Sequence, residues 1–102
     1  MYKIKKRQRE NAKEEGVIIR PSTRKFKKID VFDMKNNKLA SIGDTRYKDF
    51  SIYLKELPKE EALKKRNAYL KRHSKEPKIK NGKRTPSYYS DQILWNWINH
   101  NL

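Results

Sequence analysis

The sequence FKKIDVFDMKNNKLASI at residues 26–42 decides the fold of this chain. Residues 26–33 are rich in β-branched and aromatic side chains, and residues 39–42 form a second short apolar run. Asn36-Asn37 lies between them, and asparagine tolerates the positive φ that tight hairpin turns require. The stretch therefore predicts a β-hairpin.

The predicted register follows from the turn. If Asn36-Asn37 forms a two-residue loop, Val31 lies opposite Ile42. Side chains alternate between the two faces of a strand, so one face of the ribbon collects the apolar residues. These residues are Ile29, Val31, Ala40 and Ile42. Such a face requires cover from another part of the chain.

The first cover is a helix predicted from about residue 58 to residue 74. Pro58 suits the first helical position, and the acidic Glu60 and Glu61 favour the positive end of the helix dipole. Basic residues follow at the other end of the segment. A narrow apolar stripe is formed by Ala62, Leu63, Tyr69 and Leu70.

A second helix is predicted after a basic loop at residues 77–84. Thr85 is a suitable N-cap and Pro86 follows it. The apolar surface of this helix consists of Tyr88, Tyr89, Ile93, Leu94, Trp97 and Ile98. We expect this helix to be mostly buried. The connector at residues 47–54 has no periodicity long enough to predict its conformation.

Residues 1–25 form the predicted basic N-terminal arm. Residues 2–15 could form a charged helix on a partner, but they lack an apolar stripe, and residues 17–19 could form a short strand or an extended anchor. Alone, we expect the arm to be disordered. The predicted fold class is α+β: a small single domain at residues 26–102, with a β-hairpin packed against two C-terminal helices, preceded by a basic extended arm.

Composition points to a negatively charged partner. The 102 residues suffice for one domain, with 34% hydrophobic and 38% charged residues, so the core must be small. Lys and Arg number 27 against 12 Asp and Glu, which gives a net charge of +15. The excess lies in residues 1–28 and 55–86, whereas residues 29–54 carry equal numbers of each sign. A surface so charged repels itself unless anions gather on it.

The candidate polyanion-binding residues are the cations of the arm, of the first predicted helix and of the basic loop. A Lys or Arg that neutralises a phosphate releases condensed counterions, which gives affinity without base reading. The candidates are Lys3, Lys5, Lys6, Arg7, Arg9, Arg24, Lys25, Lys64, Lys65, Lys71, Arg72, Lys78, Lys80, Lys83 and Arg84. Those of the helix and the loop could form one basic surface, although a merely soluble Lys-rich helix would look the same.

The aromatic residues near these cations have two interpretations. Tyr47, Phe50 and Tyr53 could stack on unpaired bases. A chain this polar has few aromatic residues for its core, so we expect these three to belong to the core.

Catalytic and metal-binding motifs are absent from the sequence. It contains no cysteine, only His73 and His100 as histidines, and three isolated glycines that form no phosphate loop. Asp30 and Asp33 point to opposite faces of a strand, and we expect both to be solvated. We therefore expect no catalytic residues, no metal, no cofactor and no small-molecule substrate.

No segment of the sequence predicts a membrane span or a secretion signal. The longest uncharged run, at residues 92–102, is too short and too polar to cross a bilayer. The N-terminus lacks the apolar core of a signal peptide.

Short stretches in residues 28–95 carry a resemblance by their order and spacing. They are KIDVF at 28–32, LASIG at 39–43, YKDF at 47–50, RNAYLKRH at 66–73 and YYSDQILW at 88–95. This part of the chain resembles a family of short basic, largely uncharacterised proteins encoded by nucleocytoplasmic large DNA viruses. The resemblance implies a viral source and no known enzymatic activity, and it assigns no active-site residues.

Two hypotheses of function remain. The first is a non-enzymatic structural protein of a large DNA virus, a minor capsid or internal virion component that contacts acidic protein surfaces, packaged nucleic acid or both. It would be located in the virion and, during assembly, in the host cell interior. The second is a sequence-nonspecific nucleic-acid-binding module of DNA packaging or of a ribonucleoprotein. The oligomeric state and the choice among DNA, RNA and an acidic protein stay open at this point.

Overall fold

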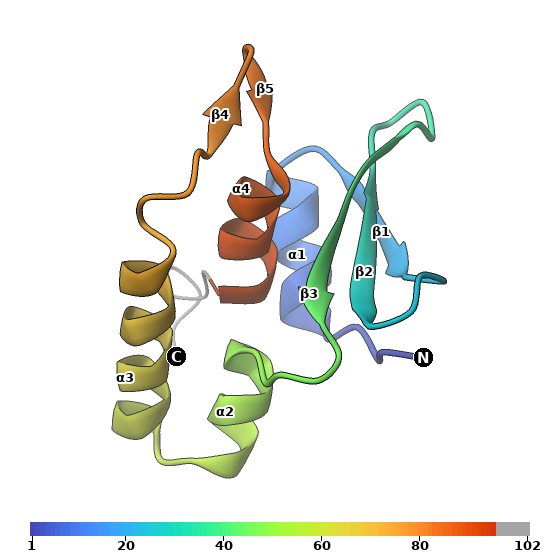
Figure 1. Ribbon diagram of the computed structural model, residues 1–102. Coiled ribbons are helices and arrows are strands. Elements are labelled where there is room, and N and C mark those ends of the chain that lie inside the picture. The colour runs from blue at the N-terminus through green and yellow to red at the C-terminus, as the bar shows by residue number, and fades with distance from the viewer. Residues whose placement is uncertain (96–102) are drawn as a thin grey trace.

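A three-stranded antiparallel sheet, in the order β1-β2-β3, forms one side of the molecule (Figure 1). The structure is a computed structural model, and it describes residues 1–95. The strands are β1 (Ile18–Pro21), β2 (Lys27–Phe32) and β3 (Lys38–Asp44). A separate small hairpin, β4 (Ile79–Lys80) and β5 (Lys83–Arg84), projects at the top of Figure 1.

The β2–β3 hairpin confirms the predicted pairing within residues 26–42, but its register differs. Ile42 lies opposite Ile29 and not opposite Val31. Because strand side chains alternate, a shift of two residues returns every side chain to the face it had. The predicted apolar face is therefore confirmed, and its four members, Ile29, Val31, Ala40 and Ile42, are buried.

Asp33 explains the register. Its Oδ1 accepts hydrogen bonds from the backbone N–H groups of Lys35 and Asn37, both at 2.9 Å. This side chain closes a turn longer than the predicted two-residue loop. Asn36, but not Asn37, has a positive φ, 71°.

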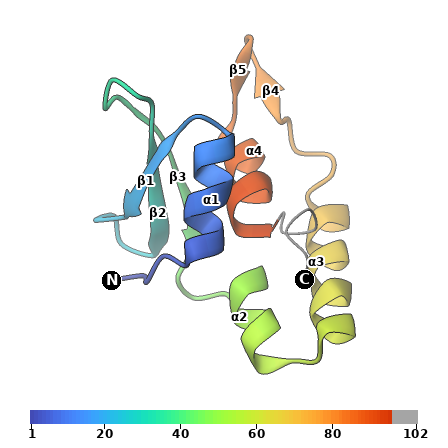
Figure 2. The same cartoon turned by 180° about the vertical axis from the view of Figure 1, so that it is seen from behind.

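Helices cover the sheet from one side. They are α1 (Lys6–Glu14), α2 (Phe50–Glu56), α3 (Lys59–Arg72) and α4 (Pro86–Ser90), and α4 continues into a π-helical turn, η1 (Asp91–Trp95). Figures 1 and 2 show α4 between α3 and the sheet, with α1 against the back of α4 and α2 below. The predicted α+β class is confirmed.

The helix signals in the sequence are mostly confirmed. The Thr85 side chain accepts a hydrogen bond from the Tyr88 N–H at 3.2 Å and caps α4. Pro58 stands one position earlier than predicted, as the N-cap residue of α3. The basic loop contains a hairpin because Asn81 and Gly82 turn the chain with φ of 53° and 74°. Trp97 and Ile98, expected on the buried surface, lie outside the described residues.

Residues 1–25 do not form the expected extended arm. They contain α1 and β1, and Ala12, Val17 and Ile19 are buried in the common core. A helix in residues 2–15 and a short strand near residues 17–19 were open alternatives, but packing of the helix within the fold was not expected. Its buried face is mostly polar: Gln8 and Asn11 are 0% and 3% exposed. The Asn11 Nδ2 donates to the Ile93 carbonyl of η1 at 3.3 Å. Hydrogen bonds from buried amides thus replace the apolar stripe that we expected of a packed helix.

Candidate polyanion-binding site

Most of the predicted polyanion-binding residues are exposed cations that form no ion pair with the part of the chain the structure describes. They are Lys3, Lys6, Arg9, Arg24, Lys25, Lys65, Lys71, Arg72, Lys80 and Lys83. Their charges are available to an anionic partner.

The other candidates are engaged within the protein. Lys5 donates to the Tyr2 hydroxyl at 3.3 Å and lies over its ring, and Arg7 and Lys64 pair with acidic residues one helical turn away. Lys78 and Arg84 have a structural role. The Lys78 ammonium lies 2.7 Å from Asp91 Oδ2 and ties the start of the hairpin to η1.

Arg84 connects the small hairpin to the end of α1. Its Nη1 donates to the backbone carbonyl of Glu15 at 3.2 Å and lies 3.4 Å from the Glu15 carboxylate. Its guanidinium also lies over the Tyr88 ring, 4.8 Å from the centroid. The predicted basic loop is thus divided into anchoring residues and the exposed pair Lys80 and Lys83 at its tip.

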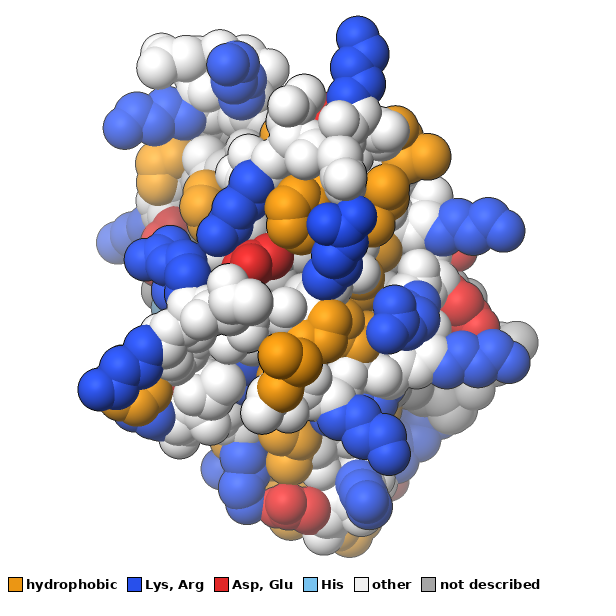
Figure 3. Space-filling model, turned by 90° about the vertical axis from the view of Figure 1, so that its right-hand side faces the viewer, with side chains coloured by type: hydrophobic (Ala, Val, Ile, Leu, Met, Phe, Trp, Pro, Cys, Tyr) orange, Lys and Arg blue, Asp and Glu red, His pale blue; other side chains and the backbone are white. Residues whose placement is uncertain are grey.

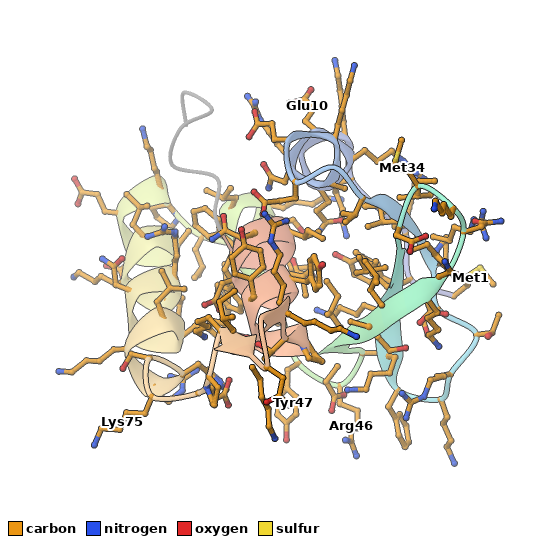
Figure 4. The ribbon with its side chains drawn as sticks, turned by 90° about the horizontal axis from the view of Figure 1, so that it is seen from above. Met1, Glu10, Met34, Arg46, Tyr47 and Lys75 are labelled. Atoms are coloured by element: carbon orange, nitrogen blue, oxygen red, sulfur yellow. The ribbon has the colours of Figure 1, made fainter. Side chains whose placement is uncertain are left out.

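The available cations lie on or just before α1, on α3, on the loop before β2 and on the β4–β5 hairpin, which occupy different sides of the molecule (Figure 1). Figure 3 shows Lys and Arg side chains spread over the sheet side with fewer Asp and Glu side chains between them. Figure 4 shows α1, with Glu10, on the opposite side of the molecule from Tyr47. The structure places two of the predicted residues, Lys65 and Arg72, in a cleft.

The basic cleft has a volume of about 620 Å³ and lies between the end of β3, the loop that follows it, α2, α3 and η1. Its cationic lining consists of Lys27, Lys28, Lys48, Lys65 and Arg72. Its aromatic lining consists of Tyr47, Tyr53, Tyr69 and Trp95. Volumes of this size are typical of small-ligand sites in proteins.

The floor of the basic cleft is a packed aromatic cluster. Tyr69 stacks on Trp95: the ring centroids are 4.0 Å apart and the ring planes are inclined by 7°. The centroid of the Tyr53 ring lies 6.3 Å from that of Trp95. The Tyr69 hydroxyl is 3.0 Å from the Ser90 Oγ. Burial raises the pKa of Tyr69 above its ordinary value. Arg66 Nε donates to the Trp95 carbonyl at 2.7 Å, which fixes η1 against α3.

The charges in the basic cleft are only partly neutralised. Lys28 pairs with Asp49 at 2.9 Å, and Lys48 pairs with Glu56. The remaining lining cations, Lys27, Lys65 and Arg72, form no ion pair with an acidic residue among residues 1–95.

The carboxylate of Asp44, which also lines the basic cleft, is paired with an arginine of the protein itself. Asp44 accepts hydrogen bonds from the Arg46 guanidinium at 2.7 and 3.0 Å, which lower the pKa of Asp44 to about 2. The cleft therefore carries an excess of positive charge beside exposed aromatic surface, a combination that suits a phosphate attached to a flat ring.

The sequence did not reveal the basic cleft, and its prediction for the aromatic residues is correct in part. Phe50 is fully buried, as expected of the core, whereas Tyr47 is 70% exposed. Asp49 carries the signal that separates them, because its side chain accepts a hydrogen bond from the Ile52 N–H at 3.2 Å and caps α2. An N-cap at this position places Phe50 inside the helix and Tyr47 before it.

The candidate carboxylates have structural roles. Asp30, expected to be solvated, is 6% exposed and accepts a hydrogen bond from the Ser41 hydroxyl at 2.6 Å. Strand pairing brings Ser41 opposite Asp30, which the predicted register did not. Among residues 1–95, no three His, Cys, Asp or Glu side chains are grouped as a metal site would need.

Comparisons of the chain with known proteins identify no relative, so the interpretation of the site rests on its geometry. No protein-family model, curated protein or solved structure matches the chain. The resemblance to proteins of large DNA viruses therefore stays a prediction. No helix within residues 1–95 has the length and apolar character needed to cross a membrane.

Proposed function

We propose that this protein is a sequence-nonspecific nucleic-acid-binding module that contacts the phosphate backbone. The observation that carries the proposal is the set of exposed candidate cations without an acidic partner in the described chain. Each of them that meets a phosphate would release counterions, and a net charge of +15 favours association with any polyanion.

The low specificity follows from the kind of side chain that is available. Seven of the ten exposed candidate cations are lysines, which are flexible point charges. Phosphate contacts fix the position of a protein on nucleic acid without reading its sequence. The cations lie on several sides of the molecule, from α1 to the tip of the β4–β5 hairpin. This distribution favours the wrapping or bridging of a polyanion over the reading of one groove.

The hypothesis of a structural virion component came from the resemblance to viral proteins and from the predicted extended arm, which was expected to become ordered on a partner. Residues 6–21 contain α1 and β1, which pack within the fold. They are therefore not an extended arm and do not support this hypothesis. A virion component that contacts packaged nucleic acid would use the same cations. Mass spectrometry of purified particles tests this location, and absence of the protein from the particles would contradict it.

The direct test of nucleic-acid binding is a salt titration. We expect the logarithm of the affinity for a short random duplex to fall linearly with the logarithm of the salt concentration, as measured by fluorescence anisotropy. The variant Lys80→Gln/Lys83→Gln should bind more weakly and reduce the slope by about one unit for each phosphate that it no longer neutralises. A shallow slope with weak binding at low salt would contradict the proposal.

A further inference from the structure

Tyr47 stands at the mouth of the basic cleft with its ring in solvent. It is 70% exposed and makes no ring contact within the described residues. Figure 4 shows its side chain pointing outward between α3 and the sheet.

Phe26 provides the contrast. It is another exposed aromatic residue, at 42%, but Arg46 lies over its ring at 4.3 Å and Lys25 at 5.0 Å from the centroid. Two cations of the protein itself therefore lie over the face of the Phe26 ring. No such contact occupies the ring of Tyr47 in the part of the chain that is described.

The cations without an acidic partner lie in the same cleft as Tyr47. Lys65 and Arg72 are seven residues apart on α3, which is close to two helical turns, so both lie on the side of α3 that lines the cleft. Lys27 lines it from β2. A phosphate inside the cleft would meet positive charge from a helix and from a strand.

We infer that the basic cleft binds one unpaired nucleotide of a single-stranded nucleic acid, with the base against Tyr47 and the phosphate near Lys65 and Arg72. The inference rests on the proposed function and adds a preference for unpaired over paired bases. A paired base hides its faces in the helical stack, whereas an unpaired base offers a flat surface to an aromatic ring.

The packed floor favours this ligand over a flexible acidic peptide. Tyr69 and Trp95 are stacked on each other and fixed by Ser90 and Arg66, so the cleft is pre-formed. Pre-formed sites lose little entropy on binding a rigid planar group. The acidic side chains of a peptide would use the cations but offer no flat ring to Tyr47.

The test compares two single strands of equal charge with a duplex. Fluorescence anisotropy would measure the affinity for an oligothymidylate, for an abasic strand with the same number of phosphates and for a duplex. We expect the protein to bind oligothymidylate about tenfold more tightly than the abasic strand. Tyr47→Ala should abolish this difference by lowering the affinity for oligothymidylate. Tyr47→Phe should keep it, since the ring remains.

A second comparison locates the phosphate. Lys65→Gln/Arg72→Gln and Lys80→Gln/Lys83→Gln each remove two exposed cations that lack an acidic partner in residues 1–95. We expect the cleft variant to lose more affinity for oligothymidylate than the hairpin variant. Equal losses, or equal binding of oligothymidylate and abasic strand by the unchanged protein, would overturn the inference while duplex binding still supports the proposed function. Absence of binding to all three probes at low salt would overturn both.

Discussion

Lys28 Nζ lies 2.9 Å from Asp49 Oδ2, and the two side chains are only 3% and 2% exposed. Asp49 also caps α2 and accepts a hydrogen bond from the Tyr2 hydroxyl at 2.6 Å. One carboxylate thus joins the N-terminal segment, β2 and α2 beneath the basic cleft. A buried charge is tolerated only when it is paired and hydrogen-bonded, and this one is.

Replacement of Lys28 by Met should destabilise the fold by about 3–5 kcal/mol, because it leaves Asp49 buried without its cation. Urea unfolding followed by circular dichroism measures the loss. The matched control is Lys48→Met, which removes one partner of the exposed Lys48–Glu56 pair and should change the unfolding free energy by about 0.5 kcal/mol or less. Similar losses in the two variants would contradict a structural role for the buried pair.

Stability should fall in acid. Burial raises the pKa of Asp49, but attraction to Lys28 and hydrogen bonds from Lys28, Ser51 and Tyr2 outweigh burial, so its pKa lies below the ordinary 3.8. The unfolded state therefore takes up the proton more readily than the folded state. The contribution of Asp49 is complete above about pH 4 and is lost as the pH falls through the lower folded value.

Urea midpoints measured between neutral pH and acid test this dependence. The pKa values of Asp30 and Asp33 are also lowered, so some loss in acid is expected in every variant. Asp49→Asn should be less stable at neutral pH and should lose less on acidification. An unchanged slope in that variant would show that Asp49 does not contribute.

Gly43→Ala should destabilise the protein by about 1–3 kcal/mol. Gly43 has a φ of 75°, and an added Cβ would lie 2.9 Å from the Leu94 Cδ1 and from the Lys28 Cδ. Gly82 is a matched control with a φ of 74° and no atom within 4 Å of an added Cβ. Gly82→Ala should therefore show the cost of the backbone conformation alone, about 1 kcal/mol. Equal effects would show that contact with η1 costs nothing.

Limited trypsin digestion distinguishes a folded N-terminus from a solvated arm. Because Ala12 is buried and Gln8 donates to the Tyr2 hydroxyl at 2.8 Å, we expect the bonds after Arg7 and Arg9 to be protected. The bonds after Lys80 and Lys83, at the tip of a hairpin with very short strands, should be cut earlier. Early cleavage within residues 3–9 would contradict the docking of α1.

The cations of the small hairpin should separate into two classes. Lys78→Met should cost about 1–3 kcal/mol, because the Lys78 ammonium pairs with Asp91 at 2.7 Å and donates to the Ser87 hydroxyl at 2.6 Å. Lys80→Met, on an exposed strand, should leave the thermal midpoint almost unchanged. Thermal unfolding of both variants measures the contrast, and equal stability would show that the Asp91 pair is not structural.

Local sequence patterns predicted the β-hairpin, its apolar face, the extent of α3 and the Thr85 cap. These features depend on contacts between near neighbours in the chain, so alternation and capping residues suffice to find them. The same patterns offered a helix in residues 2–15 only as an alternative. Its docking depends on the bond from Asn11 to the distant Ile93 carbonyl and on Gln8, which bonds the Tyr2 hydroxyl that in turn reaches Asp49. Amides at these positions look like surface residues until the partner is known.

The sequence by itself determined the excess of positive charge, the fold class and the small size of the core. Only the tertiary structure decided which cations are held by acids: Lys78 and Lys28 pair with residues that lie far along the chain, whereas Lys65 and Arg72 pair with none in residues 1–95. It also decided that Tyr47 lies outside the core beside them. The physical reason is that composition fixes how much charge and apolar surface exist, while pairing and burial depend on distances that only folding sets.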